Sequence, residues 1–473
     1  MARRARNPIG VLVVVAAVPA VLLGSLTVFA RGKAEPTTVA VVDLPVVTPP
    51  ALATPLLSLR RSPGALASDV RRTAVGAAAR QMMTGIDSTS CAVVSLNDRV
   101  VATTNETLAL IPASNLKVLV AAVALEVLGE QFTFSTQVLG PQPIDGVVRG
   151  DVHLVGGGDP VLSEAWYTQP SATRKRPPIH ATSIESLADA LKSAGITRIT
   201  GRLVVDDSRY DAERYPPGWS DDIRSSSDGV PVGALVVNDS TNSAGALSTD
   251  PTGAASSTFV RLLETRGISV EGGRATGAPV AGLPVLASVQ SAPLPLIVEE
   301  MLSTSDNLTA EMMLKEIGRA AGGAGTRAAG VQVILQRLAD WGVPTAGVNL
   351  TDGSGLSRDN SVPCATFITV LQRFPASSSL GAGMARAGEA GTTLADTYTR
   401  DGLNGVVQAK TGSLTGVKSL GGYFVAGTDE VQFIVIQNGP TATDYLSVWD
   451  DLADVLLAAA ATPTADSLAL AGS

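Results

Sequence analysis

The amino-acid sequence predicts an α/β protein of the α+β type, in which an antiparallel sheet is flanked by helices and interrupted by a β-rich insertion. Three observations lead to this prediction. Strand-like runs occur near both ends of the chain, at residues 91–105 and 406–438. Helical periodicity dominates residues 292–342. Residues 136–290 consist mainly of short strand-like runs between Gly- and Pro-rich turns, which indicates one or more inserted β-rich domains. Within them, an amphipathic helix is predicted at residues 183–195.

The first and last parts of the chain are expected to form one α/β domain from residues 68–135 and 291–460. The first part begins with a helix predicted at residues 70–84, and a β-hairpin follows it. The second part combines several helices with the late strands and ends with a helix at residues 444–461. The Ala- and Ser-rich residues 461–473 are expected to be a disordered tail.

The N-terminus has the composition of an export segment. Basic residues in MARRARN precede a mostly apolar stretch from Ile9 to Ala30. This pattern predicts a signal peptide or membrane anchor at residues 1–30, and we favour an uncleaved anchor in the cytoplasmic membrane. Residues 31–67 are rich in Pro, Ala, Thr and Val and predict an extended linker. The rest of the chain is therefore expected to be extracytoplasmic.

Composition excludes several classes of function. The net charge of −8 and the lack of a long basic run argue against a nucleic-acid partner. The two histidines, His153 and His180, lack a metal-ligand partner four residues on, so no metal site is expected. The two cysteines, Cys91 and Cys364, could form a disulfide outside the cytoplasm or remain two buried thiols, and the sequence leaves both possibilities open.

Ser114 and Lys117 form an S-x-x-K pair at the start of a strongly apolar run, residues 112–129. Serine becomes a nucleophile when a base takes its proton, and a residue three positions later on a helix lies on the same face. Lysine can be that base if burial or a nearby cation lowers its pKa. The alternative is a helix-capping Ser114 and a surface Lys117. Of the seven lysines, only Lys117 has a serine three residues before it.

A second motif, Ser305-Asp306-Asn307, falls between two helical stretches in a loop that could reach a cleft. Ser305 could relay a proton near Lys117, and the Asn307 amide could hold a substrate carbonyl. The alternative is that one of the three residues merely caps the next helix. The S-x-N pattern also occurs at residues 95–97 and 240–242, and we prefer Ser305 for its helix–loop–helix setting.

A third motif, Lys410-Thr411-Gly412, lies in a strand-like run before a Gly-rich turn. Lys410 could supply the second cation near Lys117 or hold a carboxylate, to which Thr411 could hydrogen-bond. Gly412 would allow close approach of the backbone, and the strand edge could pair with an extended substrate.

The three motifs, in the order S-x-x-K, S-D-N and K-T-G, resemble the set found in penicillin-binding proteins and β-lactamases. The wide gap from Ser114 to Ser305 points to an inserted domain between the first two motifs. Four further segments complete a resemblance to the D-alanyl-D-alanine carboxypeptidase/endopeptidase family, the class C low-molecular-mass penicillin-binding proteins. They are GGGDPVL (156–162), YPPGW (215–219), PVGALVVND (231–239) and DGSGLSR (352–358).

The resemblance implies a penicillin-binding transpeptidase/β-lactamase-like fold and acyl transfer on peptidoglycan stem peptides, without a cofactor. Ser114 would be acylated and Lys117 would be its base, and β-lactams would acylate the same serine. Backbone N–H groups of Ser114 and of a residue near Ser413 would stabilise the oxyanion. The other positions that match the family are the catalytic Ser305, Asn307 and Lys410 and the substrate-binding Thr411, Gly412, Ser413, Asp159 and Arg358.

Rival interpretations share part of this chemistry. A class A β-lactamase would need a glutamate in an E-x-x-L-N segment, and Glu311, Glu316 and Glu389 all lack that context. A lipase-like esterase would need G-x-S-x-G, which is absent from the sequence. A non-catalytic or slow β-lactam- or cell-wall-binding protein on the same fold remains an alternative. The sequence does not distinguish carboxypeptidase from endopeptidase.

Overall fold

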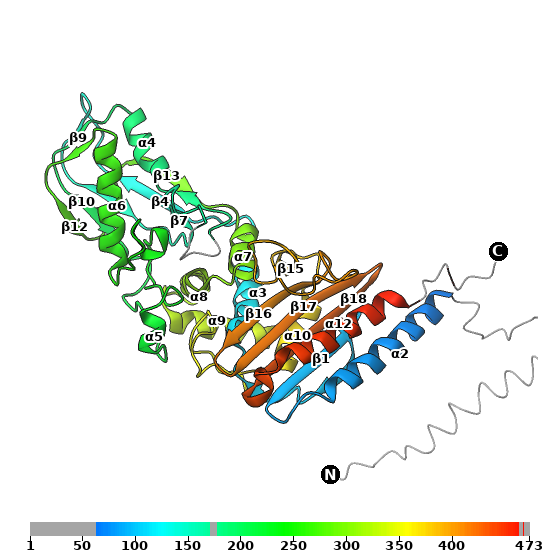
Figure 1. The fold of residues 1–473 in the computed structure, drawn as a ribbon. Coiled ribbons are helices and arrows are strands. Elements are labelled where there is room, and N and C mark those ends of the chain that lie inside the picture. Colours follow the sequence, from blue (N-terminus) through cyan, green and yellow to red (C-terminus); the bar gives the residue numbers. More distant parts are fainter. Residues whose placement is uncertain (1–62, 171–176, 463–466, 468–473) are drawn as a thin grey trace, which may run out of the picture. The chain divides into compact units, whose positions relative to one another are not determined.

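The computed structural model describes residues 63–170 and 177–462, together with residue 467 (Figure 1). The predicted export segment, residues 1–30, and the linker up to residue 62 lie outside the described residues. Within the described part of the chain, no helix combines the length and the apolar composition needed to cross a membrane.

The catalytic part is built on a six-stranded antiparallel sheet that joins the two ends of the described chain. The early strand β1 pairs with the late strand β18, with Ser90 opposite Gln437 and Leu96 opposite Val431. Figure 1 shows this pairing as a blue strand beside an orange one. The strands, in sheet order, are β15 (Ala385–Arg386), β16 (Gln408–Leu414), β17 (Val417–Ala426), β18 (Asp429–Asn438), β1 (Ser90–Leu96) and β2 (Arg99–Thr104).

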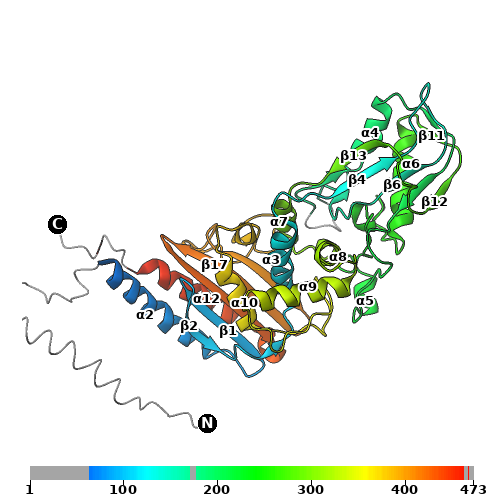
Figure 2. The same ribbon diagram turned by 180° about the vertical axis from the view of Figure 1, so that it is seen from behind.

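Both faces of this sheet are buried. All seven residues of β1 are buried, because successive side chains point into two different cores. Ala92 and Val94 pack with α2 (Pro63–Met83) and α12 (Tyr445–Ala461), which lie side by side on one face. Cys91 and Val93 pack into the larger core on the other face. Figure 2 shows the helices of that second face.

The helices of the larger core surround α3 (Leu116–Leu128), in which every residue from Leu116 to Leu125 is buried. This burial follows from the continuous apolar sequence of the helix. The helices around it are α7 (Leu294–Ser303), α8 (Asn307–Ala321), α9 (Arg327–Asp340), α10 (Cys364–Arg373) and α11 (Ser379–Ala382). A disulfide between Cys91 and Cys364 joins β1 to α10 and resolves the alternative that the sequence left open.

The terminal helices differ slightly from the predictions. The helix predicted at residues 70–84 is α2, which begins at Pro63, inside the segment predicted to be linker. Proline is well suited to the first turn of a helix, since its missing N–H would have no partner there. The last helix ends at Ala461, and the predicted tail beyond it lies outside the described residues except at residues 462 and 467.

A separate five-stranded sheet is formed between β4, which begins at Ser135, and β13, which ends at Gln290. Three of its strands are parallel, so helices must connect them. One of these, α4 (Glu185–Ser193), is expected from the sequence, whereas α6 (Pro251–Thr265) is not. The strands, in sheet order, are β12 (Arg274–Thr276), β10 (Leu203–Asp206), β6 (Val152–Val155), β4 (Ser135–Leu139) and β13 (Val285–Gln290).

Smaller elements complete the fold. They are the three-stranded sheet of β5 (Val147–Val148), β9 (Arg198–Ile199) and β11 (Ser269–Val270), the strand pairs β3 (Ala109–Leu110) with β14 (Val362–Pro363) and β7 (Leu162–Ser163) with β8 (Thr182–Ser183), and the short helix α5 (Asp221–Arg224).

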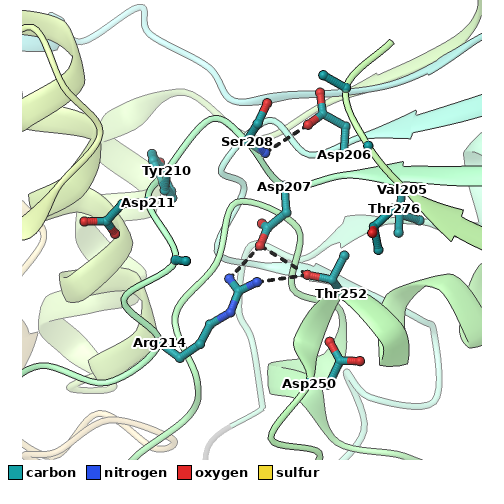
Figure 3. A pocket seen from close by; sticks show the side chains of 13 residues that line it. Val205, Asp206, Asp207, Ser208, Tyr210, Asp211, Arg214, Asp250, Thr252 and Thr276 are labelled. Atoms are coloured by element: carbon teal, nitrogen blue, oxygen red, sulfur yellow. Dashed lines mark hydrogen bonds and ion pairs between the residues drawn. The ribbon is translucent and has the colours of Figure 1, made fainter.

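The loop after β10 is held by a dense polar network, shown in Figure 3. The Asp207 carboxylate accepts hydrogen bonds from Thr252 Oγ1 at 3.1 Å and from the backbone N–H of Leu235 at 2.9 Å, and it pairs with Arg214. In the same loop, Arg209 and Tyr210 donate hydrogen bonds to the carboxylate of Glu316 on α8. The loops of the insertion are therefore bonded directly to α8.

We expect loss of the disulfide to destabilise the catalytic part, because it connects residues 273 positions apart. Replacing Cys91 and Cys364 together by alanine should lower the free energy of unfolding by about 2 to 5 kcal/mol. Thermal unfolding with and without a thiol reductant measures this. The reductant should lower the melting temperature of the wild type and leave that of the double variant unchanged. Equal melting temperatures for oxidised wild type and double variant would contradict the prediction.

Candidate active site

Ser114 lies in a tight 3₁₀ turn, Ala113–Asn115, directly before α3. Two glycines allow other segments to pack against this turn. A Cβ atom on Gly355 would lie 2.0 Å from the carbonyl oxygen of Ala113, and one on Gly412 would lie 2.9 Å from that of Pro112. The loop 352–358 and strand β16 therefore approach Ser114 from two directions, at distances that only glycine permits.

A buried hydrogen-bond chain fixes the turn to strand β17. Ser419 Oγ donates to the carbonyl oxygen of Pro112 at 2.7 Å and accepts from Asn115 Nδ2 at 2.8 Å. Both side chains are fully buried. The sequence analysis missed Ser419 and Asn115, because neither belongs to a motif and each acts only through this tertiary contact.

Lys117 is fully buried, and its ammonium group makes three hydrogen bonds. Lys117 Nζ lies 2.9 Å from Ser114 Oγ, 2.8 Å from Asn307 Oδ1 and 2.7 Å from the carbonyl oxygen of Ser354. The structure thus brings together the first two motifs, which are 190 residues apart in the sequence. The alternative of a surface lysine is wrong.

Burial lowers the pKa of Lys117 from 10.5 to about 8. The charged groups that act most strongly on it are carboxylates, led by Asp306 and Asp352, and they oppose this shift by stabilising the ammonium form. The sequence analysis expected a second cation to help lower this pKa. Desolvation instead outweighs the surrounding negative charge, and it leaves a substantial neutral fraction of Lys117 near pH 8.

The three residues of the second motif make different contacts. Asp306 caps α8, since its carboxylate accepts the backbone N–H of Thr309 at 2.6 Å. Asn307 begins the helix, and its Nδ2 donates to the carbonyl oxygen of Asp228 at 3.1 Å while its Oδ1 faces Lys117. Ser305 adopts a left-handed conformation with φ of 68° and lines the same pocket as Ser114. The capping alternative therefore describes Asp306 only.

The third motif lies on β16. Thr411, Gly412 and Ser413 line the pocket of Ser114, whereas Lys410 is fully buried. Lys410 Nζ donates to the carbonyl oxygen of Thr411 at 2.7 Å.

The pocket has a volume of about 370 Å³ and contains residues of all three motifs. The other side chains that line it come from five places in the sequence: Asp228, Leu356, Thr393 with Thr397, Lys418, and Tyr445 with Trp449. Among the described residues, no cluster of three or more His, Cys, Asp or Glu side chains is arranged to hold a metal ion.

Asp159 and Arg358 do not line this pocket, contrary to the expectation from the resemblance. Asp159 is only 1% exposed, and its carboxylate accepts the backbone N–H of Val161 at 3.0 Å, as a turn aspartate before Pro160 would. Burial raises its pKa to about 6. The Arg358 guanidinium is directed to the β16–β17 turn, where it donates to the carbonyl oxygen of Thr415 at 2.8 Å.

Glu311 is a buried residue of α8 that the sequence analysis did not assign to the site. Its carboxylate accepts the backbone N–H groups of Gly353 at 3.0 Å and Ser354 at 2.7 Å. The carbonyl oxygen of Ser354 in turn accepts from Lys117. Burial and the neighbouring Asp352 raise the pKa of Glu311 to about 7. Its position four residues after Asn307, on the same helix face, is a signal in the sequence that could have identified it.

Asp352 joins two of the segments that carried the family resemblance. Its carboxylate accepts from Trp219 Nε1 at 2.9 Å and from the backbone N–H of Ser357 at 2.6 Å. The segments YPPGW and DGSGLSR are therefore joined at Asp352, two residues before Ser354, whose carbonyl oxygen accepts from Lys117. Their contacts stabilise the loop next to Lys117.

Comparison with known proteins places the chain in a family. The model of the D-Ala-D-Ala carboxypeptidase 3 (S13) family matches residues 78–247 and 232–459. A D-alanyl-D-alanine carboxypeptidase of Actinomadura sp. (strain R39) is 29% identical over 427 residues, which cover 73% of this chain and 76% of that protein. A carboxypeptidase of Mycobacterium tuberculosis is 31% identical over 364 residues, with 70% and 72% covered.

Solved structures show the same fold. Penicillin-binding protein 4 of Haemophilus influenzae superimposes with a TM-score of 0.67 at 22% identity, over 80% of this chain and 98% of that one. A predatory endopeptidase of Bdellovibrio bacteriovorus superimposes with a TM-score of 0.51 at 16% identity, over 79% and 94%. The predicted fold class and the family resemblance are both confirmed, and the chain belongs to the D-Ala-D-Ala carboxypeptidase 3 (S13) family of serine peptidases.

Proposed function

We propose that Ser114 is the nucleophile with which this D-Ala-D-Ala carboxypeptidase or endopeptidase cleaves peptidoglycan stem peptides, and that Lys117 is its base. The observation that carries the proposal is the 2.9 Å hydrogen bond between Lys117 Nζ and Ser114 Oγ, in a lysine that burial keeps partly neutral near pH 8. A neutral amine at this distance can accept the hydroxyl proton as the serine attacks.

The reaction would proceed by acyl transfer. Ser114 Oγ attacks the carbonyl carbon of the penultimate D-Ala while its proton passes to Lys117 Nζ. Backbone N–H groups of Ser114 and Ser413 would stabilise the oxyanion. The tetrahedral intermediate collapses when the C–N bond breaks, and the leaving amine takes the proton from Lys117, for which Ser305 in the pocket wall is a suitable relay. Water then hydrolyses the acyl-serine.

The remaining motif residues would position the base and the substrate. Asn307 holds Lys117 through Oδ1 and the backbone of Asp228 through Nδ2, so it couples the base to the pocket wall. Thr411 and Ser413 present hydroxyl groups to the pocket, where they would hydrogen-bond the substrate. Gly412 permits the close packing of β16 on the Ser114 turn, and buried Lys410 supports this strand through the carbonyl group of Thr411.

We further propose that β-lactams acylate Ser114 and that the chain acts outside the cytoplasmic membrane. Penicillin-binding protein 4 of Haemophilus influenzae has been solved in complex with a β-lactam, which supports the first proposal. The basic residues before the apolar run at residues 9–30 support export, with that run as a membrane anchor or a cleaved signal.

We also propose that the inserted segment and the segments that carry the three motifs are separate domains, because each part has its own sheet.

A fluorescent penicillin should label the wild-type ectodomain at Ser114 and should leave Ser114→Ala unlabelled. Peptide mapping of the adduct, together with release of D-Ala from a D-Ala-D-Ala peptide, measures both halves of the proposal. Ser193→Ala, an exposed residue of α4, is the control and should behave as wild type. An adduct on another residue would refute the assignment of the nucleophile. Labelling without turnover would favour a β-lactam- or cell-wall-binding protein.

The rate of acylation should rise with pH, because only neutral Lys117 accepts the serine proton. With a pKa of about 8, the rate at pH 7 should be about a tenth of its plateau above pH 9. Stopped-flow labelling with penicillin across this range gives the midpoint, and circular dichroism checks that the fold is unchanged. A rate that is flat between pH 6 and 9 would exclude Lys117 as a base with this pKa.

Replacing Glu311 by glutamine should lower the pH midpoint of acylation and reduce the plateau rate by about tenfold. The midpoint falls because the carboxylate, which stabilises the ammonium form of Lys117, is removed. The plateau falls because one oxygen that accepts the backbone N–H of Gly353 is lost. Glu271→Gln, an exposed carboxylate of the insertion, is the matched control and should change neither quantity. A lower plateau with an unmoved midpoint would assign Glu311 a purely structural role.

A further inference from the structure

One end of the active-site pocket is formed by residues outside the three motifs, Lys418 on β17 and Tyr445 and Trp449 on α12. We propose that Lys418 and the indole N–H of Trp449 bind the free carboxylate of the leaving D-amino acid. This end of the pocket would thereby select substrates that end in a free carboxylate. The inference rests on the proposed function of Ser114 and adds the residues that decide which leaving group is accepted.

The ammonium group of Lys418 is held at the pocket wall. Lys418 lies opposite Ser413 in the β16–β17 register, and its Nζ donates to Ser413 Oγ at 2.6 Å. The same nitrogen lies 4.8 Å from the centroid of the Tyr445 ring, which is a cation–π distance. Two contacts therefore hold the cation beside the strand residue whose N–H is proposed to bind the oxyanion.

Trp449 contributes a buried donor that has no acceptor. The side chain is 6% exposed, its ring packs edge-on against Tyr445 at 4.8 Å, and it lines the pocket. Its Nε1 has no hydrogen-bond partner in the part of the chain that the structure describes, and the same holds for Thr393 Oγ1 in the same wall. A buried donor without an acceptor is unfavourable, so an acceptor supplied by a ligand would be favoured there.

The two charged side chains that line the pocket favour one orientation of the bound substrate. Among the lining side chains, Asp228 is the only carboxylate and Lys418 the only cation. The backbone carbonyl oxygen of Asp228 accepts from Asn307 Nδ2, while the ammonium group of Lys418 donates to Ser413 Oγ. In a D-Ala-D-Ala substrate the terminal carboxylate is attached to the carbon next to the scissile nitrogen, so it lies close to Ser114. Charge complementarity places that carboxylate at the Lys418 end and the acyl part of the substrate at the Asp228 end.

The test compares the wild type with variants of Lys418 on two substrates. The substrates are an N-acylated D-Ala-D-Ala peptide with a free carboxylate and the same peptide with a terminal amide. In Lys418→Met, kcat/KM for the free acid should fall by about 10- to 30-fold, while kcat/KM for the amide changes by less than about twofold. Lys418→Arg should keep most of the activity on the acid. Lys192→Met, an exposed lysine of α4, is the matched control and should act as wild type on both.

Trp449→Phe tests the second donor, because it removes the indole N–H and keeps an aromatic ring, while the amide substrate controls for the packing lost with the smaller ring. It should lower kcat/KM for the free acid by about three- to fivefold and spare the amide. Equal losses on both substrates, in either variant, would show that these residues act only in packing and would overturn the proposal. Unchanged kinetics on the acid in Lys418→Met would overturn it as well.

The failure of this inference is distinguishable from failure of the proposed function. If neither peptide is hydrolysed but penicillin still labels Ser114, the peptidase assignment fails. The acylation rates of benzylpenicillin and of its methyl ester then provide the same comparison, since they differ only in the carboxylate. Loss of the preference for benzylpenicillin over its ester in Lys418→Met would support the carboxylate subsite. An unchanged preference would refute it.

Discussion

The site depends on one costly interaction, the burial of the Lys117 ammonium group. Removing a charge from water is unfavourable, and the protein meets this cost with three oxygen acceptors and with carboxylates at longer range. The acceptors come from three separate segments, which must all be in place. The balance between desolvation and these carboxylates sets the pKa of Lys117 at about 8, which suits the proposed role of the amine as a base.

The topology explains how such distant segments converge. The sheet closes by pairing β1 with β18, so the first and last parts of the chain form one core around α3. Ser114, the proposed nucleophile, lies in the turn directly before that buried helix, and the K-T-G strand packs against this turn. Because β16 is held in register with β17, and β17 is bonded to the Ser114 turn through Ser419, the nucleophile and the strand cannot shift independently.

Local patterns predicted the elements that have strong sequence periodicity and the residues that lie in short motifs. The terminal strands, the apolar helix α3 and the meeting of Ser114, Lys117 and Asn307 are of this kind. Helix α6 was missed because small or polar residues, Thr252, Ala255 and Ser256, occupy the buried positions of its first half, so only its second half shows an apolar period. Ser419 and Glu311 were missed because they act through backbone groups far away in the sequence, and Asp159 was misplaced because the motif around it does not reveal which way the side chain points.

Helix α8 has a consequence for the energetics of the whole chain. Its first residue, Asn307, binds the catalytic base, and its later residues Lys315 and Glu316 bind loops of the insertion. A helix of 15 residues moves as one rigid rod, so a displacement at one end is felt at the other. The hydrogen bond that holds Lys117 and the contacts to the insertion are thus made by one continuous helix, so the loops of the insertion help to fix the position of Asn307.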